Sequence, residues 1–255
     1  MQMDIGDQVR KYGPDEWAVR TDLAAAYRLV ALFGWDDLVF THVSARVPGR
    51  HDRFLINPYG WMFDEITASS LVAIDLQGRK LDPDAEADIN PAGFLIHSAI
   101  HAARPDAQCV LHTHSQNGVA VATHRSGLLA LSQQSLFVLA SLGYHDYEGV
   151  ALNDEERPRL VQDLGDKTNL ILRNHGLLTV GATVADAVLA MYVMESACSI
   201  QLKAQSGSSD LVAIQPAILA GIQAQAAQVT RGLGAALVWP GLLRKLDRID
   251  PSYRT

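Results

Sequence analysis

The sequence is poor in cysteine, since Cys109 and Cys198 are the only two in 255 residues. A disulfide-stabilised scaffold needs many cysteines in a short chain, so this class of protein is excluded. Two isolated thiols in a chain of this length are typical of a reducing compartment. We therefore expect both cysteines to be free.

Dense blocks of positive charge are also absent, and the formal net charge is −7. Nucleic acids are bound through clustered lysine and arginine side chains, so we expect no nucleic-acid partner. The most apolar stretch, 184–202, is interrupted by Asp186 and Glu195, and the N-terminus lacks the order of a signal peptide. The sequence thus predicts a cytoplasmic protein with no membrane partner.

The order of the periodic segments predicts one α/β domain. Helical spacing and strand-like runs alternate along the chain, and only 205–209 resembles a linker. We expect a single three-layer domain over residues 1–204, with a mixed central β-sheet flanked by helices. Residues 205–255 are expected to form a linker, one helix (about 215–232) and a C-terminal tail, which pack on the same domain or on a neighbouring subunit. Helices are expected at 14–33, 91–103, 115–124 and 183–203, and strands at 38–46, 53–57, 71–75, 108–114, 169–173 and 177–180.

Nine histidines stand out against the two cysteines. His112 and His114 lie two residues apart in a predicted strand, so their side chains share one face of the sheet. His175 lies in a predicted tight turn before Gly176 and offers a third nitrogen. Three neutral histidines leave coordination positions open, which is typical of a catalytic divalent-metal site. The alternative interpretation is that these histidines are only buried and hydrogen-bonded.

Three segments resemble the class II aldolase/adducin family in both order and spacing: AGFLIHSAIHAARPDA (92–107), VLHTHS (110–115) and NHGLLTVG (174–181). The resemblance covers roughly residues 15–205. It implies a mixed sheet flanked by helices, a homotetramer with the active site between subunits, and a divalent metal bound by His112, His114 and His175. Zinc is the metal expected first, with manganese or iron as alternatives.

The sugar-phosphate aldolases of this family have a catalytic glutamate near the start of the helix before the Arg-Pro-Asp-Ala turn. The matching position in this sequence is Gly93. Glycine has no side chain that could move a proton. The family's Gly-Asn-Val-Ser turn reads Thr-His-Val-Ser here and ends at Ser44, and its Thr-Pro-Thr-Gly turn reads Asn-Pro-Tyr-Gly from Asn57 to Gly60. These exchanges weaken the case for a phosphorylated substrate. With them, the sequence resembles the adducin head domain more than the sugar-phosphate aldolases. By position, Ser44, Asn57, Gly60 and Gly93 are the expected substrate-binding residues.

Two histidines are candidates for the vacant acid/base role. His97 lies one helical turn after Gly93 and shares a helix face with His101, a spacing that also suits a helical metal pair. His42 lies in the loop that the family uses for substrate. The alternative for each is a buried or solvated histidine without catalytic function. Tyr253, near the C-terminus, is a further expected substrate-binding residue, because the resemblance implies a tail tyrosine folded over the active site.

The expected function is that of a metal-dependent lyase. It would cleave a C–C bond of a small hydroxy-carbonyl or carboxylate substrate, by retro-aldol cleavage or decarboxylation, through a metal-stabilised enolate. Decarboxylation does not need a base to take up a hydroxyl proton, so the missing glutamate leaves both reactions open. Two alternatives remain: a non-haem iron oxygenase or decarboxylase on the same three histidines, and a non-catalytic adducin-like scaffold.

Overall fold

The fold is built on a mixed seven-stranded sheet with the order β3-β2-β1-β4-β7-β6-β5, in which only β5 and β6 pair in parallel. The computed structural model describes residues 5–82, 88, 90–150, 153–207, 210–212 and 214–255. The strands are β1 (His42–Arg46), β2 (Arg53–Ile56), β3 (Val72–Asp75), β4 (Cys109–Thr113), β5 (Leu142–His145), β6 (Asn169–Leu172) and β7 (Gly176–Gly181).

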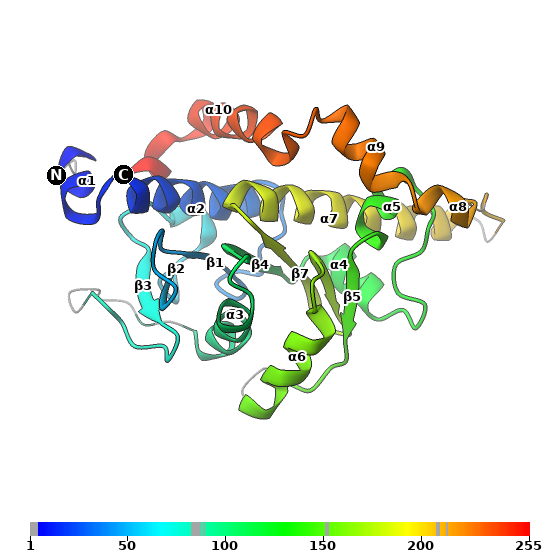
Figure 1. Ribbon diagram of the computed structural model, residues 1–255, viewed down its shortest axis with the longest axis horizontal. Helices are drawn as coiled ribbons and strands as arrows, with labels where there is room; N and C mark the ends of the chain where they lie inside the picture. Colours follow the sequence, from blue (N-terminus) through cyan, green and yellow to red (C-terminus); the bar gives the residue numbers. More distant parts are fainter. Residues whose placement is uncertain (1–4, 83–87, 89, 151–152, 208–209, 213) are drawn as a thin grey trace.

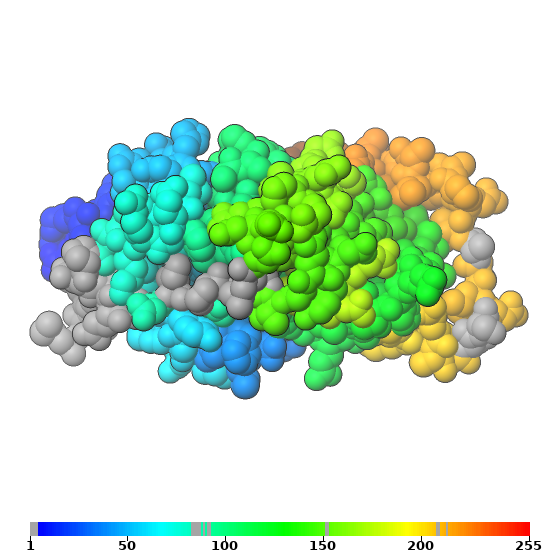
Figure 2. Space-filling view, turned by 90° about the horizontal axis from the view of Figure 1, so that it is seen from below, coloured from blue at the N-terminus to red at the C-terminus, as the bar shows by residue number. Residues whose placement is uncertain are grey.

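Helices cover both faces of this sheet (Figure 1). The long helices α2 (Pro14–Leu32) and α7 (Val184–Gly207) pack on one face and enclose the larger core, while α3 (Pro91–Ala103) and α6 (Arg157–Leu164) enclose a smaller core on the other. Figure 2, seen from below the view of Figure 1 and so from the side of α3 and α6, shows cyan surface toward one end and a bright green ridge, the colour of α6, across the middle. The single mixed-sheet α/β domain is confirmed.

The remaining helices are short. They are α1 (Ile5–Tyr12), α4 (Gln116–Ala122), α5 (Gln133–Leu139), α8 (Pro216–Leu219), α9 (Ile222–Val229) and α10 (Trp239–Ile249). Among the described residues, no helix is both long enough and apolar enough to cross a membrane.

Strand β1 shows why the site lies where it does. Both faces of this strand are buried, and its residues alternate in character. Val43 and Ala45 enter the larger apolar core, so His42 and Ser44 project toward the opposite face, where α3 packs. The same alternation in β4 directs Leu111 into the larger core and His112 to the α3 side. Polar chemistry is thus gathered between the sheet and α3.

The C-terminal region differs from the expected linker, single helix and tail. Helix α7 continues to Gly207, the segment 215–232 contains two helices, and the expected tail contains α10. Helix α10 buries Trp239 and Leu246, and α9 and α10 lie over α2 and α7 as a further layer of the same chain (Figure 1). The sequence predicted no helix or strand in residues 128–150, but the structure has α5 and β5 there. Both elements are too short to give a clear periodic signal in the sequence.

Candidate metal and proton-transfer site

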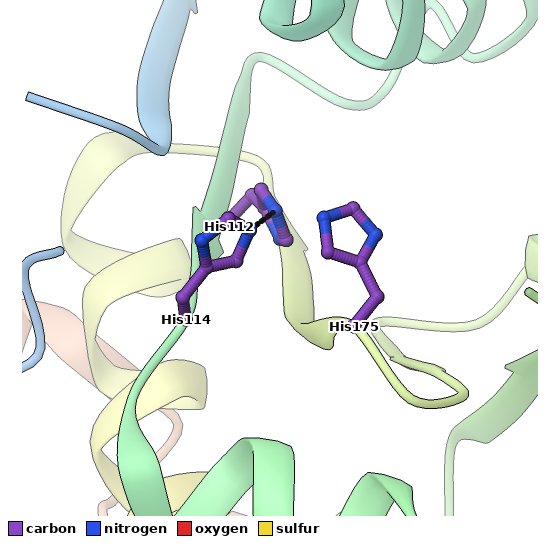
Figure 3. Close-up of side chains that lie close together, drawn as sticks. All are labelled: His112, His114 and His175. Atoms are coloured by element: carbon purple, nitrogen blue, oxygen red, sulfur yellow. Dashed lines mark hydrogen bonds between the residues drawn. The ribbon is translucent and has the colours of Figure 1, made fainter. Parts of the chain in front are cut away.

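Three histidine rings converge at the C-terminal end of β4, the central strand of the sheet (Figure 3). His112 is in β4, His114 follows the end of that strand, and His175 lies in the turn between β6 and β7. Each pair of ring centroids is 4.8 Å apart, and the candidate ligand nitrogens all lie within 4.8 Å of one another. The strand pair and the turn therefore bring together the three residues that the sequence nominated.

Hydrogen bonds on the far side of two rings fix their orientation. Nδ1 of His112 donates to the carbonyl oxygen of Leu177, and Nδ1 of His114 donates to the Asp37 carboxylate, each at 2.9 Å. The two Nε2 atoms are left facing each other at 3.1 Å. Two nitrogens bound to one tetrahedral zinc at 2.0–2.1 Å lie about 3.3 Å apart, so this spacing fits a shared ion. Two lone pairs at such a distance repel unless a cation lies between them.

The protonation of these rings also suits a metal. Burial and neighbouring histidines lower the pKa of His112 well below its ordinary range, and burial with His114 nearby lowers that of His175 to about 4. Both rings are therefore neutral near pH 7 and offer lone pairs. Carboxylate–histidine pairs such as Asp37–His114 are a common support of metal ligands.

Gly176 is required for the close approach of this turn to β4. A Cβ atom on Gly176 would lie 2.3 Å from the carbonyl oxygen of Thr113, closer than real Cβ contacts. The residue after His175 must therefore lack a side chain for the ring to reach His112.

The three histidines open into a cavity of about 230 Å³ between the sheet and α3. Its other walls carry both apolar and polar side chains. The lining residues are Phe40, Thr41, His42, Tyr59, Asn90, Gly93, Ile96, His112, His114, Val150 and His175.

His42 occupies the space that a side chain at position 93 would need. A Cβ atom built on Gly93 would lie 2.2 Å from Nδ1 and 2.3 Å from Cε1 of the His42 ring. His42 also pairs directly with His112 across β1 and β4, so both side chains lie on the same face of the sheet. The imidazole of His42 is thus placed beside the candidate metal ligands, where a residue on α3 would otherwise project.

The ring nitrogens of His42 are notable for lacking a hydrogen-bond partner in the part of the chain that the structure describes. Both ring nitrogens are buried and unpaired among the described residues, and so is the hydroxyl of Thr41 beside it. Burial and the nearby His114 lower the pKa of His42 to about 3, so the ring is neutral near pH 7. Buried groups without partners are costly and rare. Such a cluster at a cavity wall therefore suits the binding of a polar ligand.

His97 and Ser44 lie behind the cavity instead of lining it. The Ser44 hydroxyl bridges Nδ1 of His97 at 2.6 Å and Nε2 of His101 at 2.8 Å. All three side chains are buried. The His97–His101 spacing therefore serves a shared serine, and the structure does not bring these two histidines together as a metal pair.

Besides Ser44, three expected substrate-binding residues lie outside the cavity lining. Asn57 is buried, and its backbone N–H donates to the Tyr27 hydroxyl at 3.1 Å. Gly60 is exposed in the loop after β2, next to the lining residue Tyr59. Tyr253 is fully buried, and its hydroxyl donates to the carboxylate of Asp247 in α10 at 2.9 Å. The expected position of Tyr253 over the site is therefore corrected: within this chain, Tyr253 fastens the C-terminus to α10.

Sequence reasoning did not find Asp37, Thr41 or Asn90. Asp37 contacts a histidine 77 positions further along the chain, and no local motif signals that contact. Thr41 adjoins His42 in a segment already assigned to substrate, so its position was a usable signal. Asn90 precedes Pro91 at the start of α3 and resembles an ordinary helix start.

The family model for the "Class II Aldolase and Adducin N-terminal domain" matches residues 21–202. The chain belongs to this family. An aldolase II superfamily protein from Pseudomonas syringae has a crystal structure that is 50% identical with a TM-score of 0.92, and the match covers 97% of this chain and 100% of that chain.

Both branches of the class II aldolase and adducin family contain relatives. The L-fuculose 1-phosphate aldolase from Glaciozyma antarctica is 27% identical with a TM-score of 0.77, over 100% of this chain and 96% of that one. Alpha-adducin from Rattus norvegicus is 39% identical over 257 residues, which are 96% of this chain but only 35% of the adducin. Metal dependence belongs to the aldolase branch, and the three-histidine cluster of this chain fits it.

Proposed function

We propose that this protein is a divalent-metal-dependent lyase that cleaves a C–C bond of a small hydroxy-carbonyl or carboxylate substrate. The observation that carries this proposal is the convergence of His112, His114 and His175 at the wall of a cavity, with the Nδ1 atoms of His112 and His114 held by hydrogen bonds. Zinc is the metal that the all-nitrogen site suits first, with manganese or iron as alternatives.

The metal would supply Lewis-acid stabilisation of the negative charge that develops on substrate oxygens. The protein's own residues orient its ligands and exclude water. The carbonyl of Leu177 and the carboxylate of Asp37 hold the rings in place, and Ile96 and Phe40 provide apolar walls.

His42 is our candidate for proton transfer. In retro-aldol cleavage it would accept the substrate's hydroxyl proton, as the hydroxyl carbon becomes a carbonyl and the electron pair of the breaking C–C bond passes to the enolate. In decarboxylation the departing CO2 leaves the electron pair of the breaking C–C bond on the substrate, and a proton taken up from solvent would pass through His42 to the new carbanion. The placement of the ring at Gly93, beside the ligands, supports this role. A neutral imidazole accepts a proton through its lone pair, and the imidazolium formed in this way can give that proton back.

A direct test is turnover by zinc-loaded protein of a panel of small hydroxy-ketones, hydroxy-aldehydes and β-keto or hydroxy acids, with and without phosphate. We expect turnover of at least one class that falls by more than about 100-fold in His42→Ala, since a positioned acid/base group contributes 10²–10⁴-fold. His124→Ala, which alters a histidine outside the cavity lining, is the matched control. Turnover that His112→Ala leaves unchanged would reject the proposal.

The likeness to alpha-adducin favours a second candidate, a scaffold that keeps the metal site without catalysis. It predicts that the metal-loaded protein binds zinc but turns over no member of the panel. An oxygenase acting on the same histidines is separated by the metal: protein purified anaerobically without iron, and showing no oxygen uptake, would exclude it.

We also propose a homotetramer in the cytoplasm. Exposed apolar side chains border the cavity, with Phe40 45%, Tyr59 41% and Val150 72% exposed, and such a patch suits a subunit contact near the site. Both cysteines are free and buried, which suits a reducing compartment. Light scattering coupled to gel filtration would test the tetramer.

A further inference from the structure

Behind the cavity, Ser44 links two histidines of α3 into a chain of hydrogen bonds whose direction the contacts determine. Nδ1 of His101 lies 3.2 Å from the carbonyl oxygen of Ala107. A carbonyl only accepts, so this nitrogen carries the proton. Burial and the Arg46 charge lower the pKa of His101 to about 3, which keeps the ring neutral and leaves its Nε2 as an acceptor.

The other protons of the chain follow from this end. Nε2 of His101 accepts the single hydroxyl proton of Ser44 across 2.8 Å. The Ser44 oxygen therefore accepts from Nδ1 of His97 across 2.6 Å. Since burial lowers the pKa of His97 and keeps it neutral, its Nε2 is a lone pair. That atom is buried and has no partner among the residues described.

The neighbouring ring with an unused N–H is His42. The centroids of the His42 and His97 rings lie 5.8 Å apart, with the rings edge to face at 83°. Neutral His42 has one N–H donor and one lone pair, and neither ring nitrogen has a partner within the described ranges of the chain. The lone pair of His97 and the N–H of His42 are thus unpaired groups on neighbouring rings, and a small side-chain rotation or one bridging water would join them.

We propose that His97 is a positioning residue: the chain from Ala107 through His101 and Ser44 presents a lone pair that takes the N–H of His42. The His42 ring is thereby held with its proton toward the core and its own lone pair toward the cavity. In this arrangement His42 is ready to accept a proton from the substrate, and the positive charge that it gains lies beside an acceptor.

This inference rests on the proposed function for its catalytic meaning, but its structural content is independent of any substrate. The arrangement also explains why two histidines and a serine are fully buried between α3 and the sheet. An apolar set of similar size would fill this space without the cost of desolvating three polar side chains.

The test is nitrogen NMR of zinc-loaded protein labelled with ¹⁵N histidine, at neutral pH. Long-range proton–nitrogen spectra distinguish the protonated nitrogen of a ring from the bare one. We expect both His97 and His101 to carry the proton on Nδ1, and His42 to show a single tautomer. A proton on Nε2 of His97 in the unmodified protein overturns the proposal, and this measurement needs no variant.

The Ser44→Ala variant breaks the chain, and Ser98→Ala is its matched control. Ser98 is also fully buried on α3, but its hydroxyl contacts the carbonyl of Leu95 instead of a histidine. We expect Ser44→Ala to mix the tautomers of His42 while zinc stays at one per chain, and Ser44→Thr, which keeps the hydroxyl, to preserve the unmodified pattern. A His42 spectrum that Ser44→Ala leaves unchanged would also overturn the proposal.

Kinetics separate this inference from the proposed function. With a substrate in hand, Ser44→Ala should lower kcat by about tenfold and change KM by less than about twofold, since one hydrogen bond near the reacting group is lost. The expected tautomers without lyase turnover would reject the function and leave the His97–His42 arrangement standing. Lyase turnover by a protein in which His97 carries its proton on Nε2 would support the function and reject the His97–His42 arrangement.

Discussion

Replacement of Gly93 by alanine tests whether His42 occupies the space at position 93. The new Cβ would lie 2.2 Å from Nδ1 of His42, so the ring or the helix must move by about 0.8 Å to reach the shortest contact that real Cβ atoms show. The ring is only 4% exposed, and α3 packs behind it. Overpacking of this kind costs about 1–3 kcal/mol, so we expect Gly93→Ala to lower the free energy of unfolding by that amount.

In the His42→Ala background the obstacle is gone. Gly93→Ala should then be neutral or should stabilise by up to about 1 kcal/mol, because alanine is the better helix residue. The two substitutions should therefore show a coupling free energy of about 2 kcal/mol, where distant sites are additive within about 0.5 kcal/mol. Urea denaturation followed by circular dichroism, on metal-free protein, measures all four corners of this cycle.

Gly241→Ala is the matched control, because Gly241 is the third residue of α10 as Gly93 is the third residue of α3. A Cβ there would meet only the end of the Arg244 side chain at 3.8 Å. We expect this change to be neutral or slightly stabilising, and additive with His42→Ala. Equal destabilisation by Gly93→Ala with and without His42 would refute the assignment of that space to the His42 ring.

Three further predictions concern metal and pH. We expect one zinc ion to bind per chain and His112→Ala to abolish this binding. Asp37→Ala should lower the zinc affinity by about 10–100-fold, because the hydrogen bond that orients His114 is removed. Isothermal titration calorimetry measures both effects, and an unchanged affinity in Asp37→Ala would contradict its role. Zinc at about 100 times its dissociation constant should stabilise the fold by about 2.7 kcal/mol and chelation should reverse this; a melting temperature indifferent to both would exclude a folded-state site. Burial lowers the pKa of His42 and His101 to about 3, so below about pH 6.5 the unfolded chain takes up protons that the folded chain does not. The free energy of unfolding should hence fall as pH drops from 6.5 toward 3, by about 1.4 kcal/mol per pH unit for each histidine. Urea titrations of metal-free His42→Asn between pH 6 and 4.5 test this. The slope of its unfolding free energy against pH should be smaller than that of the unmodified protein by the contribution of one histidine.

The part of this site that sequence could predict is the part that local rules govern. His112 and His114 share a face because a strand alternates its side chains, and Gly176 after His175 marks a turn that needs a bare backbone. Gly93 was recognised as the missing glutamate by its place in a motif. The same local rules gave the bounds of α2 and α3 to within one residue.

What sequence could not predict depends on contacts between distant segments. Asp37 reaches His114 from a loop, and nothing near either residue signals the pairing. Ser44 was assigned to substrate by its motif, but the alternation of β1 directs it to α3 and its hydroxyl is already taken by two histidines. Tyr253 was assigned by analogy with a mobile tail, whereas α10 holds the C-terminus against the body of this chain.

The direct pairing of His42 with His112 across β1 and β4 has a geometric consequence. Opposed residues on antiparallel strands keep their Cα atoms about 4.5–5.5 Å apart, and the continuous pairing of β1 with β4 from His42 to Ala45 makes that spacing stiff. Under the proposed function, this fixed spacing sets how many bonds separate the substrate atom that binds at the histidine cluster from the substrate atom that exchanges a proton with His42. Loops around the cavity mouth can change which molecule enters without altering that length, so substrate range and reaction geometry can diverge separately in this fold.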